Sequence, residues 1–288
     1  MTKLILFKIG LFGFFSIIAN AQDVNNETSK PSLNNIIPKK NQKKLTTEDD
    51  QNLRLRILSY NIHHAEGVDG KLDVPRIAQV ILSVDPDLVA LQEVDKNTIR
   101  TGKVNQDIEL SRLTKMNSVF GSNITFQGGQ YGNAILSKFP IIKNKNFLLP
   151  NVDSGEQRGL LQSQIQISNK ENVLFFSTHL DHRRSDTERL ASAKAINQII
   201  SLDNKSPAIL AGDFNDVPDS PTLKELGKVW LRTNKKILRT IPASKPSRQI
   251  DYIFVQPKER WKIIESQILD EDIASDHRAI FSIIELIK

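Results

Sequence analysis

The stretch Ala208-Ile209-Leu210-Ala211-Gly212-Asp213-Phe214-Asn215-Asp216 decides the fold, because it places an acidic turn directly after a buried strand. Far along the chain, Ser275-Asp276-His277-Arg278 stands directly before another apolar stretch, Ala279-Ile280-Phe281. Oxygen ligands at strand ends suit a hard cation such as Mg²⁺, and a positioned Asp and His suit proton transfer to or from a bound water. The two stretches therefore predict a site for metal-assisted chemistry on a phosphoryl group.

A strand–helix–strand unit is predicted near the start of the folded region. Residues 55–60 alternate between apolar and polar and run into Asn61. Residues 73–84 form an amphipathic helix with Asp as its N-cap and an early Pro. The apolar strand 88–91 follows and ends at Glu93. This order brings Asn61 and Glu93 to equivalent strand ends.

The remaining elements are mostly short strands. A second amphipathic helix is expected at 186–201. Further strands are expected at 133–136, 141–149, 160–167, 173–178, 208–211, 251–255 and 279–286. Mixed strand lengths with few but regular helices favour an α/β architecture of two packed sheets with helices outside.

The chain is expected to divide into three parts. Residues 1–21 have a basic start, a short apolar run and a small-x-small end, which is typical of a secretory signal peptide; a retained membrane anchor is the alternative. Residues 22–52 are polar and predict a disordered linker. Residues 53–288 are long enough for one catalytic domain with a sizeable core.

Composition narrows the class of protein further. The chain contains no cysteine, which excludes disulfides and a lipid-modified lipoprotein. Removing the signal peptide with Lys3 and Lys8 lowers the formal charge from +6 to +4. A mildly basic protein can take an anionic substrate without requiring nucleic acid.

Each polar residue at a strand end also has an ordinary structural interpretation. Glu93 could be an exposed turn carboxylate, and His179 a satisfied core histidine. Asp213 and Asn215 are residue types that favour turns, although two positions apart in an extended chain they face the same side. Asp276 could cap an element.

The joint pattern is more specific than its parts. The motifs, in chain order, are Asn61; Leu91-Gln92-Glu93-Val94; Ser177-Thr178-His179-Leu180; Gly212-Asp213-Phe214-Asn215; Ile250-Asp251-Tyr252; and Ser275-Asp276-His277. This order resembles the endonuclease/exonuclease/phosphatase superfamily, which includes deoxyribonuclease I, over essentially all of 53–288. Two segments resemble, in more detail, secreted bacterial metal-dependent hydrolases of that superfamily. They are Tyr60-Asn61-Ile62-His63-His64 and Thr178-His179-Leu180-Asp181-His182-Arg183.

The resemblance implies a four-layered α/β sandwich, in which two mixed sheets pack face to face with helices on both outer sides. It also implies a Mg²⁺ cofactor, with Mn²⁺ or Ca²⁺ as alternatives. Glu93 is then the principal ligand, with Asn61 and Asp276 in or next to the metal shell.

The same resemblance implies catalytic roles. Asp213 and Asn215 position the attacking water and the phosphate, and Asp213 is one candidate base. His277, oriented by Asp251, is the other candidate base or a phosphate stabiliser. His179 donates a hydrogen bond to a phosphoryl oxygen.

Three residues are weaker, substrate-binding candidates. Asp181 and His182 are expected to touch metal or phosphate, with a surface turn as an equal alternative. Arg158 is a candidate phosphate ligand, with a solvated loop residue as its alternative. The family often orients the histidine at position 179 with a carboxylate near Gln130, and this sequence has no carboxylate there.

Together these features predict an exported, secreted or periplasmic, Mg²⁺-dependent phosphodiesterase that acts on nucleic acid or on a lipid or sugar headgroup. A phosphomonoesterase of the inositol-phosphatase type is the alternative. A non-catalytic binding module should have lost a strand-end acid or histidine, and none is missing. The mature chain is expected to be a monomer without a transmembrane segment. A basic stretch with Trp230, between 228 and 239, is a further candidate for nucleic-acid or headgroup contact.

Overall fold

Two six-stranded sheets make up the fold in the computed structural model, which describes residues 53–203 and 206–287. The first has the order β11-β12-β1-β2-β4-β3, with bounds Trp261–Ile268, Ile280–Leu286, Leu53–Asn61, Leu88–Lys96, Gly129–Ser137 and Asn117–Phe126. The second has the order β5-β6-β7-β8-β10-β9, with bounds Ile141–Leu148, Gly159–Gln166, Asn172–His179, Ala208–Asp213, Asp251–Gln256 and Leu231–Arg232. The expected signal peptide (1–21) and linker (22–52) lie outside the described residues.

Both sheets are mixed, and each contains one parallel pair of strands. In the first sheet β1 and β2 are parallel and are joined through α1 (Val74–Leu82). In the second sheet β7 and β8 are parallel and are joined through α3 (Thr187–Ser201). The other strand pairs are antiparallel. The two sheets therefore share one feature: each contains a parallel pair whose carboxyl ends lie at the same end of the sheet.

The alternation along β1 shows how the layers form. Leu55 and Ile57 lie in the apolar cluster between the two sheets, whereas Leu58 and Tyr60 lie in the cluster under α1. Since successive side chains of a strand point to opposite faces, β1 contributes to both clusters at once. The predicted strand–helix–strand unit is confirmed, with Asp73 accepting a hydrogen bond from Arg76 N as the N-cap of α1.

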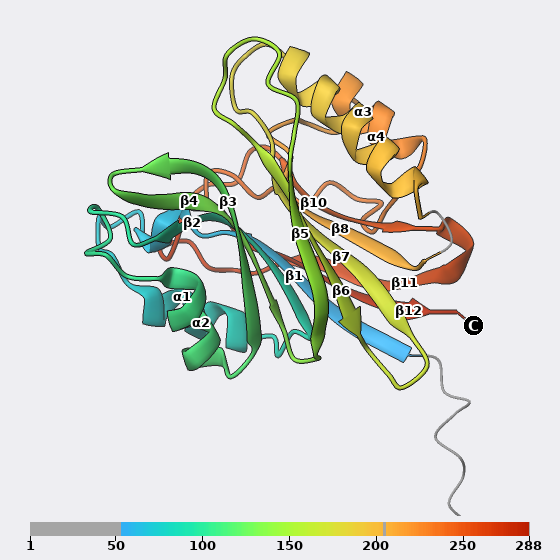
Figure 1. Ribbon diagram of the computed structural model, residues 1–288, viewed down its shortest axis with the longest axis horizontal. Coiled ribbons are helices and arrows are strands. Elements are labelled where there is room, and N and C mark those ends of the chain that lie inside the picture. The colour runs from blue at the N-terminus through green and yellow to red at the C-terminus, as the bar shows by residue number, and fades with distance from the viewer. Residues whose placement is uncertain (1–52, 204–205, 288) are drawn as a thin grey trace, which may run out of the picture. The chain divides into compact units, whose positions relative to one another are not determined.

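Helices cover both outer faces, as Figure 1 shows with α1 and α2 on one side and α3 and α4 on the other. The outer cluster of the second sheet includes Ala193, Ile196 and Ile200 of α3 against Phe176 and Leu210. The four-layered α/β sandwich with two packed mixed sheets is thus confirmed. None of the helices in 53–203 and 206–287 has the length and apolar content needed to cross a bilayer.

Two α-helices and three strands were not expected from the sequence. They are α2 (Gln106–Thr114), α4 (Pro221–Gly227), β3, the two-residue strand β9, and β11. Strands β3 and β11 are the outermost strands of the first sheet, and most of their residues are only partly buried or exposed. They extend the sheet without adding a residue to the strand ends that the sequence analysis singled out.

Gly212 allows the parallel strands β7 and β8 to approach each other closely. A Cβ built at this position would lie 2.1 Å from the carbonyl oxygen of Thr178, its registered partner. Real Cβ atoms essentially never approach backbone that closely. Gly212→Ala is therefore expected to lower the free energy of unfolding by about 1–3 kcal/mol, as overpacking does, measured by urea denaturation.

Gly227→Ala is the matched control, because a Cβ at this position in α4 meets no atom within 4 Å. Its stability should be unchanged or higher by up to about 1 kcal/mol, since Ala loses less backbone freedom on folding than Gly. Equal urea midpoints for the two variants would contradict the close approach at Gly212.

Candidate active site

Five strands bring the candidate residues together. Asn61 ends β1, and Glu93 lies within β2, directly after Gln92, the registered partner of Asn61. His179 and Asp213 end β7 and β8, where they are registered partners. Asp251 begins β10 and is registered with Asp213 on its other side. The site thus lies at one end of the interior strands of the two sheets, where the two sheets meet.

Asp213 is the centre of the site. Its Oδ1 accepts a hydrogen bond of 2.8 Å from the Asn215 backbone N–H, and its Oδ2 accepts one of 3.1 Å from Asn61 Nδ2. Nε2 of His179 lies 3.5 Å from Oδ2, and Nε2 of His277 lies 3.7 Å from it. Asn215 has a φ of 51°, a left-handed conformation that Asn tolerates better than most residues. The structure therefore brings four other predicted site residues around the Asp213 carboxylate.

Burial and a second carboxylate change the acidity of Asp213. The side chain is 1% exposed, and this burial, reinforced by the nearby charge of Asp251, raises the pKa of Asp213 to about 7. His277, the Asn215 N–H and Asn61 act in the opposite direction. A carboxyl group with a pKa near neutrality is suited to exchange a proton with water under physiological conditions.

His277 is held as a cation by two acids. Its Nδ1 donates a hydrogen bond of 2.9 Å to Asp251 Oδ2. Burial alone would lower the pKa of His277, but the charges of Asp251 and Asp213 outweigh it and raise that pKa to about 10. The expected orientation of His277 by Asp251 is thus present in the structure, and it favours the imidazolium.

His179 is positioned by an arginine. Arg158 Nη1 lies 3.3 Å from His179 Nδ1, and since guanidinium only donates, Nδ1 accepts and Nε2 carries the proton. Burial and then the Arg158 charge lower the pKa of His179 well below its usual value. Nε2 lies 3.0 Å from Asn215 Nδ2, itself a donor, and 3.5 Å from Asp213 Oδ2, so the Asp213 carboxylate is the acceptor that faces the Nε2 proton.

Glu93 lies at an irregularity in the sheet. The pairing of β2 with β4 shifts between Leu91 and Val94, and Glu93 has a φ of 58°. Its Oε1 accepts a hydrogen bond of 3.0 Å from Asn61 Nδ2. Within the described residues, Oε2 accepts none. A carboxylate oxygen left open beside an amide fits a hard cation such as Mg²⁺.

Asn61 contacts Glu93, and the segment that carries Asp276 contacts Asn61. Asn61 Nδ2 bridges Glu93 and Asp213, and Asn61 Oδ1 accepts from the His63 backbone N–H at 3.1 Å. Ser275 Oγ donates to the Asn61 carbonyl oxygen at 2.7 Å, which places Asp276 next to the end of β1. Asn61 therefore links Glu93 to Asp213, and Asp276 lies near Asn61 in the segment before β12.

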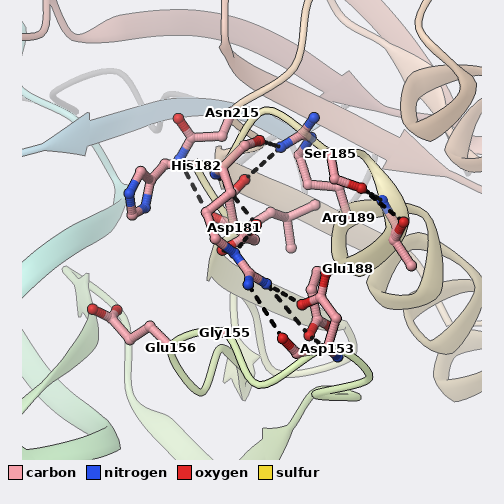
Figure 2. Close-up of polar contacts among 12 residues, drawn as sticks. Asp153, Gly155, Glu156, Asp181, His182, Ser185, Glu188, Arg189 and Asn215 are labelled. Atoms are coloured by element: carbon pink, nitrogen blue, oxygen red, sulfur yellow. Dashed lines mark hydrogen bonds and ion pairs between the residues drawn. The ribbon is translucent and has the colours of Figure 1, made fainter.

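Asp181 has a structural partner. Its carboxylate accepts two hydrogen bonds from Arg183 Nε, at 3.1 and 3.0 Å, and Arg183 also pairs with Asp153 and Glu188. Figure 2 shows the three acidic residues of this network, Asp153, Asp181 and Glu188. Glu188 in turn accepts from the backbone N–H groups of 152 and 153. The structure thus places Asp181 in a network that joins the loop before β6 to the loop after β7.

The other two weaker candidates lie with His179. Arg158 is buried and forms a salt bridge of 2.8 Å with Glu156, and its Nη2 lies 3.3 Å from Nδ1 of the exposed His182. Sequence reasoning missed Glu156, and it could not show that Arg158 takes the place of the family's carboxylate beside His179. Trp230 of the basic stretch is buried against Phe176, with ring centroids 6.1 Å apart, and so offers no stacking surface.

His63 and His64 were not singled out as site residues from the sequence. They lie with Glu93 in a group whose ligand atoms are all within 4.8 Å of one another. Asp213, Asp251 and His277 form a second such group. The signal for the first group is the left-handed backbone of His63, His64 and Ala65, with φ values of 46°, 43° and 62°, which the sequence does not display.

Known proteins share this chain's sequence pattern and fold. The model of the Endonuclease/Exonuclease/phosphatase family matches residues 58–277. The uncharacterised protein YbhP of Escherichia coli (strain K12) is 26% identical over 228 residues, which cover 73% of this chain and 87% of YbhP. The 5'-tyrosyl-DNA phosphodiesterase of Caenorhabditis briggsae is 30% identical over 148 residues, 50% of this chain and 38% of its own length.

A solved structure agrees with the observed architecture. The mannosyl-6-phosphatase of Bacteroides thetaiotaomicron VPI-5482 superposes with a TM-score of 0.67, over 80% of this chain and 99% of that one, at 20% identity. This likeness shows that the two chains share a fold.

Proposed function

Since the chain belongs to the endonuclease/exonuclease/phosphatase family, and is therefore a metal-dependent hydrolase of phosphate esters, we propose that it is an exported Mg²⁺-dependent phosphodiesterase. The observation that carries the proposal is the convergence on Asp213 of Asn61, Asn215, His179 and His277. A base of near-neutral pKa lies there among donors suited to a phosphoryl group.

Each residue has a distinct task in the proposed reaction. Asp213 Oδ2 takes a proton from the attacking water as the water oxygen bonds to phosphorus. The bond from phosphorus to the leaving ester oxygen breaks, and the leaving oxygen takes up a proton from solvent as the alcohol departs. The protonated Nε2 atoms of His179 and His277 donate to phosphoryl oxygens, where negative charge develops. Asn215 keeps the Asp213 carboxylate in place through its backbone N–H.

Glu93, with Asn61 and Asp276 beside it, would hold the metal ion, which when bound supplies Lewis-acid stabilisation of the phosphoryl charge. Asn61 Nδ2 donates to both Glu93 and Asp213, so it fixes the spacing between the metal side and the base. The choice of Mg²⁺ over Mn²⁺ or Ca²⁺ rests on the preference of an oxygen-rich donor set for a hard ion.

The proposal is tested with a divalent-dependent activity panel on the purified domain. The substrates are plasmid DNA, RNA, bis-p-nitrophenyl phosphate, p-nitrophenyl phosphate, inositol phosphates and sphingomyelin. We expect hydrolysis of a diester that requires Mg²⁺ and stops with a chelator. Hydrolysis of monoesters alone would overturn the diesterase assignment.

A phosphomonoesterase is the second candidate, and the surroundings of His179 favour it. Arg158 and His182 add donors beside that ring, which suits the extra charge of a terminal phosphate. Glu156 compensates part of the positive charge of Arg158, which leaves less charge to attract a terminal phosphate. The diesterase therefore remains the first proposal. The ratio of bis-p-nitrophenyl phosphate to p-nitrophenyl phosphate turnover decides between them.

Export is proposed from the N-terminal sequence. A basic start, a short apolar run and Ala19-Asn20-Ala21 support cleavage after Ala21 and a secreted or periplasmic protein. N-terminal sequencing of protein from the medium or periplasm should therefore begin at Gln22. Mature protein that keeps Met1 and fractionates with the membrane would contradict export and favour an anchor.

A further inference from the structure

The turn after β1 places two imidazoles beside the carboxylate of Glu93. One ligand atom each from His63, His64 and Glu93 lies within 4.8 Å of the other two. The two rings pack edge to face, with centroids 4.5 Å apart. Neither histidine has a role in the proposed hydrolysis, and the turn that carries them is left-handed at three successive non-glycine residues.

Glu66 fixes which nitrogen of each ring is available. His63 Nδ1 lies 3.0 Å from the Glu66 carbonyl oxygen, and His64 Nε2 lies 3.3 Å from Glu66 Oε2. Because both of these partners are acceptors, each of these nitrogens carries its proton. The lone pairs are therefore on His63 Nε2 and His64 Nδ1. Metal-binding histidines are typically held in this way, by a carbonyl or carboxylate on the other nitrogen.

The free nitrogen of His64 is an independent sign of a missing ligand. The residue is 7% exposed, and within the described residues its Nδ1 is buried without a hydrogen-bond partner. A buried polar atom without a partner costs free energy. The charge of Arg100, which acts on His64, is compensated by Asp95 through hydrogen bonds of 2.7 and 2.8 Å. The charge of Arg100 therefore repels a cation bound at His64 only weakly.

We propose that His63 Nε2, His64 Nδ1 and a Glu93 oxygen form a binding site for a zinc-type divalent ion, which shares Glu93 with the oxygen-rich Mg²⁺ side. Two imidazoles and one carboxylate are a donor set that Zn²⁺ accepts with a water in the remaining position, and that Mg²⁺ does not prefer. Glu93 Oε1 already accepts from Asn61, so Glu93 lies between this site and the catalytic residues.

The test measures metal binding rather than hydrolysis, so it can succeed or fail whether or not the proposed diesterase activity is found. Chelator-stripped protein is titrated with Zn²⁺ by isothermal calorimetry, and with Co²⁺, whose visible absorption reports nitrogen ligands. We expect one Zn²⁺ per chain. His63→Ala and His64→Ala should each weaken binding by at least about 10-fold, and Glu66→Ala by about 10–100-fold, as for partners behind the ligands.

His182→Ala is the matched control, because His182 also lies near the active site but contacts Arg158 instead. It should bind Zn²⁺ like the wild type. His64→Gln accompanies His64→Ala in case the buried deletion unfolds the chain, which circular dichroism reports. Unchanged Zn²⁺ affinity in folded His63→Ala would overturn the proposal. So would loss of binding only in Asp251→Asn, which would place the ion at Asp213, Asp251 and His277 instead.

Discussion

Asp213→Asn is expected to lower kcat by about 10²–10⁴-fold, the usual contribution of a general base, while the chain stays folded. Asparagine keeps the shape of the side chain and can still accept from Asn215 N and face Asn61, but it cannot take a proton from water. Asp270→Asn is the matched control, since that carboxylate is 95% exposed and contacts Arg278 outside the site. Steady-state kinetics measure the loss of kcat, and circular dichroism shows whether the variant stays folded.

The dependence of activity on pH tests the same role of Asp213 together with that of His277. Asp213 must be ionised to act as the base, so activity should rise as the pH rises through its pKa of about 7. His277 must be protonated to donate, so activity should fall as the pH rises through its pKa of about 10. A bound divalent cation would move both limbs to lower pH without changing their order.

Asp251→Asn is expected to move both limbs of the pH–rate profile in the same direction. The Asp251 carboxylate helps to raise the pKa of His277, so its loss should move the alkaline limb to lower pH. The same carboxylate also raises the pKa of Asp213, so the acidic limb should move to lower pH as well. A profile unchanged by Asp251→Asn, or near-wild-type turnover in Asp213→Asn, would remove Asp213 as the base and break its pairing with His277.

Glu93→Gln is expected to reduce Mg²⁺-dependent turnover by more than about 100-fold. Changing a partner behind a metal ligand already costs 10–100-fold, and Glu93 is placed as the ligand itself. Glutamine can keep the contact with Asn61 Nδ2 but loses the charge that holds a hard cation. The Mg²⁺ titration of activity should shift to higher concentration while the melting temperature stays within a few degrees.

Glu109→Gln supplies the control for Glu93→Gln, because Glu109 pairs with Arg112 on the surface of α2. It should leave the Mg²⁺ titration unchanged. Identical titrations for the Glu93 and Glu109 variants would show that Glu93 is not the principal ligand.

The sequence predicted the parts of the fold that carry strong periodicity. The helices α1 and α3 and the strands beside them were expected, because their apolar residues follow one clear period. The strands β3 and β11 were missed, because both are sheet edges whose mixed burial removes the alternation that marks a strand. The helices α2 and α4 are too short, and α2 too polar, for a helical period to stand out.

The candidate site was predictable as a set of residues but not as a set of contacts. Motif order placed Asn61, Glu93, His179 and Asp213 at strand ends, and the structure brings them together. The order of the motifs could not show that Arg158 lies against His179, because that contact depends on how the loop before β6 folds.

Asp181 was equally ambiguous in the sequence, since a carboxylate beside His182 suits a metal and an ion pair alike. Its partner Arg183 is two residues away, and only the geometry of the turn shows that the two side chains meet. The turn at His63 and His64 was hidden for the same reason, because left-handed backbone at non-glycine residues has no sequence signature.

The pairing of β1 with β12 has a consequence for the order in which the protein matures on the ribosome. Leu53 pairs with Leu286, so the first strand of the domain has no partner on that side until nearly all of the domain has been synthesised. Asp276 and His277 lie just before β12 and reach the site only when that strand is in place. A nascent chain that already contains Glu93, His179 and Asp213 therefore still lacks Asp276 and His277. The residues of the site come together only after β12 has been synthesised.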